Sequence, residues 1–90
     1  MGTFHIGKHE LHGITVVVDT EGAETYVGRC DDIVDGRVIL RDAAVHRDGE
    51  SAASKQEFLD KAAQWGVFAD HKRLVIAETT VASIRRLGEL

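Results

Sequence analysis

The chain has 90 residues, of which 43% are hydrophobic and 29% are charged, with nine glycines, one cysteine and no proline. A chain of this length builds one small core and leaves no room for a second, and its composition excludes a disordered protein. The formal net charge of −4 argues against a whole surface that binds nucleic acid, although a local basic patch stays open.

The cysteine count and the N-terminus bear on the compartment. Cys30 has no second cysteine with which to form an internal disulfide, so nothing indicates an oxidising environment. The first nine residues lack the apolar stretch of a signal peptide, and no apolar run is long enough to cross a bilayer. The sequence therefore predicts a cytoplasmic protein without a membrane span.

The first clear pattern lies between residues 13 and 30. β-branched side chains alternate with period two over 14–19, which predicts a strand, and the polar stretch 20–24 suits a hairpin loop. A second strand pattern resumes over 25–30. Gly28 lies inside it, where glycine marks a bulge, a sharp bend or a close approach of backbones.

A third strand follows a second break. The break begins at the acidic pair 31–32 and ends with Asp35-Gly36, a strong hairpin signal because both central residues of a type I′ turn need positive φ. Residues 37–42 then alternate again. The stretch 13–43 is therefore expected to form a three-stranded meander.

The meander is followed by a predicted loop and helix. Residues 44–53 are small and polar and are expected to form a loop that includes His46. Ser54 and Glu57 have the spacing of a capping box, and Gly66 is placed to end the helix in the left-handed conformation. An apolar stripe at helical spacing runs between them, made of Phe58, Leu59, Ala62, Ala63 and Trp65.

The two ends of the chain are less defined. Residues 73–78 predict a fourth strand, Thr79-Thr80 interrupts it, and 81–87 fits either a closing strand or a helical turn. The first eleven residues fit a short strand or an irregular arm.

Four stretches carry a family pattern of glycines and apolar positions: Leu11–Val18, then Gly22, Tyr26 and Gly28, then Val38–Ala43, and finally Leu74–Val81. This pattern resembles the Sm-like family, which includes the Sm proteins and the bacterial host-factor RNA chaperone. The resemblance implies a mainly β fold, a small, strongly bent, five-stranded antiparallel barrel with SH3-like topology, in one domain over residues 1–90. One α-helix is inserted between strands three and four, within an insert at about 44–72.

The same comparison removes the family's RNA site. Sm-like proteins stack uracil between a loop aromatic and the arginine of an Ile-Arg-Gly motif, with a loop asparagine reading the base edge. Here the loop over 31–37 has neither an aromatic residue nor asparagine, and Ala77 and Glu78 stand where arginine and glycine are expected. The fold and the ring assembly are therefore implied, whereas the uridine pocket is not.

The sequence gives only weak support for metal binding or nucleophilic catalysis. His5, His9 and His12 have spacings that suit one helix face and a metal, but the neighbouring glycines and the missing further ligands favour a polar arm. The acidic residues 31, 32 and 35 lack the pattern of a calcium loop. Cys30 lies in a predicted strand, where it serves as an apolar filler, and His46 and His71 are expected in loops. No metal, cofactor or catalytic residue is predicted.

Two sets of residues remain as candidate binding sites. Arg37, Lys72 and Arg73 are the candidate phosphate contacts for RNA, against the simpler interpretation of ordinary surface charge paired with carboxylates. Trp65 is expected either to anchor the helix to the barrel or to contact another subunit. The candidate subunit interface consists of Trp65, Phe58, Val75 and Ile84.

The predicted function is that of a non-enzymatic barrel that forms a cyclic homo-oligomer by pairing its edge strands, with RNA as a candidate ligand at a non-standard site. The alternative is a protein-interaction or assembly scaffold that uses the inserted helix and binds no nucleic acid.

Overall fold

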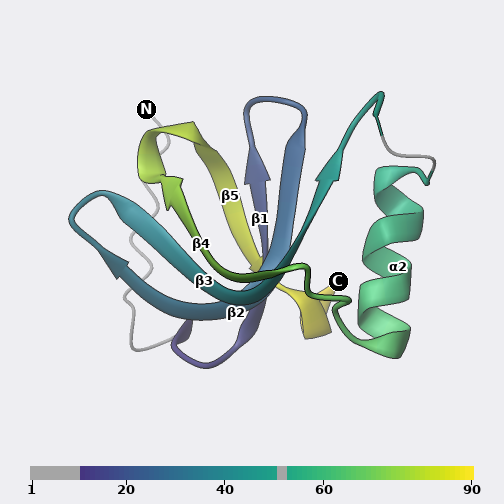
Figure 1. Cartoon of the computed structure of the whole chain (residues 1–90), viewed down its shortest axis with the longest axis horizontal. Coiled ribbons are helices and arrows are strands. Elements are labelled where there is room, and N and C mark those ends of the chain that lie inside the picture. Colours follow the sequence, from purple (N-terminus) through teal and green to yellow (C-terminus); the bar gives the residue numbers. More distant parts are fainter. Residues whose placement is uncertain (1–10, 51–52) are drawn as a thin grey trace.

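The computed structural model describes residues 11–50 and 53–90. Five antiparallel strands form one sheet in the order β4-β3-β2-β1-β5, and one helix is inserted between β3 and β4 (Figure 1). The elements are β1 (Thr15–Thr20), β2 (Glu24–Val34), β3 (Arg37–Arg47), α2 (Lys55–Trp65), β4 (His71–Ala77), the short 3₁₀ turn η1 (Glu78–Thr80), β5 (Val81–Arg86) and the 3₁₀ turn η2 (Leu87–Glu89). This arrangement confirms the predicted fold class.

The sheet bends sharply where β2 and β3 pass each other. Their pairing shifts register between Val27 and Arg29 and again between Cys30 and Asp32. A Cβ added at Gly28 would lie only 2.7 Å from Cβ of Ala43, so only glycine fits between the strands. The close approach predicted at Gly28 is confirmed, and it lets the sheet curl into a barrel.

Two apolar clusters lie on the two faces of this curved sheet. The first fills the barrel and includes Val16, Val18, Leu40 and Ile76 among its members. The second lies between the outer face of the sheet and the helix, and consists of Val17, Val27, Leu59, Ala62 and Leu87, with Phe58 and Val67 packed against it. The helix is thus held against the outside of the barrel, as Figure 1 shows for α2.

The hairpin between β2 and β3 turns at Asp35 and Gly36, whose φ angles of 53° and 72° are those required of a type I′ turn. This confirms the Asp-Gly prediction. The backbone N–H of Glu78 donates to the carbonyl of Gly36 over 2.8 Å, so η1 lies against this hairpin.

Two predicted breaks begin later than expected, because strand pairing continues through the polar residues at their start. Asp31 and Asp32 lie inside β2, which runs on to Val34. Residues 44–47 belong to β3, where they pair with residues 24–27 of β2. His46, expected in a loop, is therefore a strand residue only 2% exposed, with its ring centroid 5.3 Å from that of Phe58. His71 is likewise the first residue of β4.

The helix follows its predicted signals. The Ser54 hydroxyl accepts a hydrogen bond from the backbone N–H of Glu57, and the Glu57 carboxylate accepts one from the N–H of Ser54, which completes the capping box. At the other end, the N–H of Gly66 donates to the carbonyl of Ala62. Gly66 has the expected positive φ of 87°, but its ψ of 170° leads the chain away extended instead of in a left-handed turn.

Of the two alternatives predicted for residues 81–87, a closing strand or a helical turn, the closing strand is correct. Residues 81–86 form the closing strand β5, and Leu87 begins the 3₁₀ turn that packs under the helix. The expectations for residues 1–10, including His5 and His9, lie outside the described residues.

Candidate assembly edges and nucleic-acid interface

The strand order leaves β4 and β5 as the two edges of the sheet. Within the described part of the chain, each of them pairs with a single neighbour, β4 with β3 and β5 with β1. Val75, a predicted interface residue, lies in the middle of β4 with 46% of its surface exposed. Ile84, predicted for the same interface, lies in β5 but is buried in the barrel cluster. Among residues 11–50 and 53–90, no strand pairs with the outer side of either edge, where another strand can add.

The β2–β3 hairpin and η1 meet where the family resemblance locates its uridine pocket. Arg37 pairs with Ala77 across β3 and β4, and Asp35 and Glu78 flank that pair in the two turns. Two carboxylates and one guanidinium give this junction no excess of positive charge. Neither of these two described turns contains an aromatic residue that could replace the missing stacking residue.

The three candidate phosphate contacts are all exposed, and none of them forms an ion pair within the described residues. They are not one cluster. Arg37 pairs with Ala77, whereas Arg73 pairs with Arg41 four positions along β3. Four residues of strand span about 13 Å. Lys72 and Arg73 thus lie together near the start of β4, with Arg37 at its far end.

The other basic strand residues follow the simpler interpretation of paired surface charge. Arg29 lies 3.1 Å from the carboxylate of Asp42, and Arg41 lies 3.1 Å from that of Asp31. Exposed pairs of this kind add little to stability, but they keep these guanidinium groups occupied.

Aromatic side chains of the inserted helix and of the segment after it are exposed to solvent, which the apolar stripe in the sequence did not indicate. Trp65 is 74% exposed, so the expectation that it anchors the helix to the barrel is wrong; Leu59 and Ala62 are the buried helix residues. Phe68, in the segment that follows the helix, is 80% exposed. Phe58, a helix residue, is half-buried, and its ring contacts that of His46.

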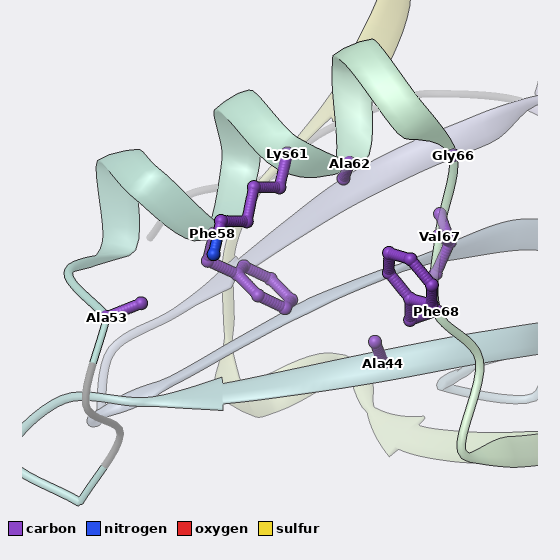
Figure 2. Close-up of a pocket in the computed structure, with 8 residues that line it drawn as sticks. All are labelled: Ala44, Ala53, Phe58, Lys61, Ala62, Gly66, Val67 and Phe68. Carbon is purple, nitrogen blue, oxygen red and sulfur yellow. The ribbon is translucent and has the colours of Figure 1, made fainter.

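A hollow of about 220 Å³ lies between α2, β3 and the segment that follows the helix. Phe58 enters it from the helix and Phe68 from the following segment, with Ala44 of β3 on the floor (Figure 2). We call this feature the aromatic hollow. Its lining side chains are apolar apart from Lys61.

Asp19 forms a polar centre that the sequence did not indicate. Its carboxylate lies 2.6 Å from Nζ of Lys55, and it accepts hydrogen bonds from the Ser83 hydroxyl and from Nε of Arg85, each over 3.0 Å. Burial raises the pKa of Asp19, but the hydrogen bonds from Lys55 and Ser83 and the charge of Arg85 outweigh it and leave this pKa below its ordinary value. These partners are far from Asp19 in the sequence, so no local motif predicts the contacts.

Three of the described residues considered for nucleophilic or metal chemistry, Cys30, Asp32 and His12, are buried or hydrogen-bonded. Cys30 is buried, and burial, followed by the charges of Asp32 and Asp31, raises the pKa of its thiol. A raised pKa disfavours the reactive thiolate. The Asp32 carboxylate accepts the N–H of Ile33, and Nδ1 of His12 lies 2.6 Å from the carbonyl of Asp31. No group of three potential metal ligands occurs among residues 11–50 and 53–90.

None of the described helices is long and apolar enough to cross a membrane. No protein-family model and no curated protein matches the chain. Among solved structures, the chain is similar to an Sm protein of Pyrococcus abyssii in complex with a uridine heptamer, at 20% identity and a TM-score of 0.57, over 87% of this chain and 89% of the other. With the strand order and the inserted helix, this likeness shows that the chain has a divergent Sm-like fold.

Proposed function

We propose that this protein is a non-enzymatic Sm-like barrel that assembles into a closed homo-oligomer and binds single-stranded RNA at a site other than the family's uridine pocket. The observation that carries the assembly is that β4 and β5 each have a single neighbouring strand among the described residues. Pairing β4 of one subunit with β5 of the next is a head-to-tail contact, and such contacts close into a ring when the rotation permits. Closure would cover both edges of every subunit.

The assembly is tested by an edge variant. Val75→Lys adds a charge to the exposed middle of β4, a device that proteins use to prevent edge pairing. We expect light scattering to show a smaller mass for this variant, with an unchanged circular dichroism spectrum. An unchanged mass would mean that β4 takes no part in assembly.

The RNA component rests on the unpaired cations. Arg37, Lys72 and Arg73 are exposed and lack carboxylate partners in the described chain, so their charges are available to phosphates. The similar archaeal Sm protein carries a uridine heptamer, which makes RNA the first ligand to test. Fluorescence anisotropy with labelled oligouridylate is expected to show binding that weakens as salt rises, and no binding at low salt would overturn RNA as the ligand.

The second candidate function is a protein-interaction scaffold that binds no nucleic acid. The observation in its favour is the exposure of Trp65 and Phe68 beside the inserted helix, since exposed aromatic groups are typical of interaction surfaces. It predicts the absence of RNA binding in the same anisotropy experiment.

A further inference from the structure

The aromatic hollow has the form of a slot between two rings. Phe58 on the helix and Phe68 on the following segment lie on either side of it (Figure 2). Lys61 lies at its rim, one helical turn from Phe58. A flat, uncharged group such as a nucleobase suits a slot with apolar walls and a cationic rim.

Exposure shows that this aromatic surface is not part of the core. Phe68 and Trp65 have most of their surface open to solvent, whereas the other large apolar side chains of the barrel are buried or half-buried with few exceptions. Trp65 follows Ala62 by three residues and Lys61 by four, so helical spacing brings it to the same side of α2 as the hollow. Trp65 does not line the hollow, but its exposure and that of Phe68 leave two aromatic side chains at the end of the helix that the core does not bury.

The charge around the hollow differs from that of the whole chain. Residues 57–73, which run from the first helix turn beside the hollow to the start of β4, contain three basic residues (Lys61, Lys72 and Arg73) against three acidic ones (Glu57, Asp60 and Asp70), whereas the whole chain has a net charge of −4. The charge of Lys61 acts on Glu57, one helical turn before it. Asp70 lies 3.7 Å from Nε2 of His71. Lys72 and Arg73, which form no ion pair among the described residues, are therefore the cations available to attract a polyanionic occupant with flat bases.

The start of β4, with Lys72 and Arg73, lies next to the strand that forms the floor of the hollow. The N–H of Asp70 donates to the carbonyl of Ala43 over 3.2 Å, and His71 pairs with Ala43, the neighbour of Ala44 on the floor of the hollow. At about 3.3 Å per strand residue, Lys72 and Arg73 follow within roughly 7 Å of His71. Successive strand residues point to opposite faces of a sheet, so the side chains of Lys72 and Arg73 extend on the two sides of this edge strand, next to the position that pairs with Ala43.

We propose that the aromatic hollow binds a base of single-stranded RNA, stacked against Phe68, while Lys72 and Arg73 contact the adjoining phosphates. The inference rests on the proposed RNA-binding function and assigns it a site on the inserted helix. Stacking on aromatic rings is tolerant of base identity, because every base has a flat face. The hollow thereby supplies the stacking that the turns near Ala77 and Glu78 lack.

The test compares Phe68→Ala with Leu90→Ala. Both remove an exposed apolar side chain, and Leu90, at 54% exposure, does not line the hollow. Labelled oligouridylate and oligoadenylate are titrated at low salt against each variant and the wild-type chain. We expect Phe68→Ala to weaken binding of both oligonucleotides about tenfold and Leu90→Ala to leave it unchanged. Trp65, as the only tryptophan, should show quenched fluorescence when RNA binds to the wild-type chain.

The outcomes separate this inference from the function on which it rests. If wild-type protein binds RNA and Phe68→Ala binds it equally well, the hollow is not the site, while RNA binding itself stands. If no RNA binds at low salt, both proposals are overturned. If Phe68→Ala lowers the mass of the oligomer and the RNA affinity per subunit stays constant, the hollow holds a second copy of this chain and the inference is wrong.

Discussion

Nζ of Lys55, the first residue of α2, lies 2.6 Å from the carboxylate of Asp19 near the end of β1. The same carboxylate binds Ser83 and Arg85 of β5. One acidic side chain therefore connects the inserted helix to an open edge of the sheet. In the proposed ring this edge contacts the next subunit, so Asp19 links the position of the insert to the assembly surface.

Asp19→Asn removes the charge that holds these partners together. We expect it to lower the free energy of unfolding by about 2 kcal/mol, because hydrogen bonds to charged groups contribute in that range. Urea unfolding followed by circular dichroism measures the change. The matched control is Asp60→Asn on the exposed face of α2, where the carboxylate accepts a hydrogen bond from the Gln56 side chain and the effect should stay within about 0.5 kcal/mol. Equal midpoints for the two variants would contradict a structural role for Asp19.

The lowered pKa of Asp19 gives stability a defined dependence on pH. Because the folded pKa lies below the ordinary value of 3.8, the stabilising contribution is fully present above that value. It is lost as the pH falls through the folded pKa. Urea midpoints measured down into the acid range should therefore fall more steeply for the wild-type chain than for Asp19→Asn. If the urea midpoints of the two proteins fell in parallel as the pH is lowered, the pKa of Asp19 would not be shifted by folding.

The close strand crossing at Gly28 makes a sharp packing prediction. In Gly28→Ala the added Cβ meets Cβ of Ala43 at 2.7 Å and the carbonyl of Arg41 at 3.2 Å, so backbone must shift. We expect a loss of roughly 1–3 kcal/mol in thermal or urea unfolding, as is usual for overpacking. Gly88→Ala is the control, since its Cβ meets nothing within 4 Å. A variant at Gly28 as stable as that control would mean that the two strands lie further apart.

Lys72 and Arg73 of β4, which form no ion pair within the described chain, predict a change in the salt dependence of RNA binding. A double variant, Lys72→Gln with Arg73→Gln, should lower the slope of log affinity against log salt by about 1.4, because each phosphate contact on single strands contributes about 0.7. Anisotropy titrations at several salt concentrations give the slope. Arg29→Gln serves as control, since that guanidinium already pairs with Asp42. If the control changes the slope as much as the double variant, the effect is one of net charge alone.

The sequence alone was sufficient to predict the turns and the helix start, because these features depend on residues that are neighbours in the chain. Asp35-Gly36 predicted its hairpin because the turn needs positive φ at both positions, and Ser54 with Glu57 predicted the helix start through a reciprocal hydrogen-bond pair. The glycine inside β2 indicated a close approach without revealing that Ala43 is the neighbour.

Features that depend on distant residues were missed or misjudged. His46 lies in polar, loop-like sequence, yet pairing with Thr25 of β2 keeps it in a strand and the helix covers it. Trp65 belongs to the apolar stripe by spacing, but the helix meets the barrel through Leu59 and Ala62, so the larger side chain stays outside. The ion pairs of Asp19 join three segments that only the folded chain brings together.

The most direct test of the proposed assembly is the native mass of the untreated protein, taken together with its absorbance ratio at 260 and 280 nm. We predict one species whose protein mass is a multiple of the 9.9 kDa subunit and larger than a dimer, with excess absorbance at 260 nm wherever RNA is retained. A monodisperse 9.9 kDa monomer at high concentration, free of nucleic acid, would contradict the proposed assembly.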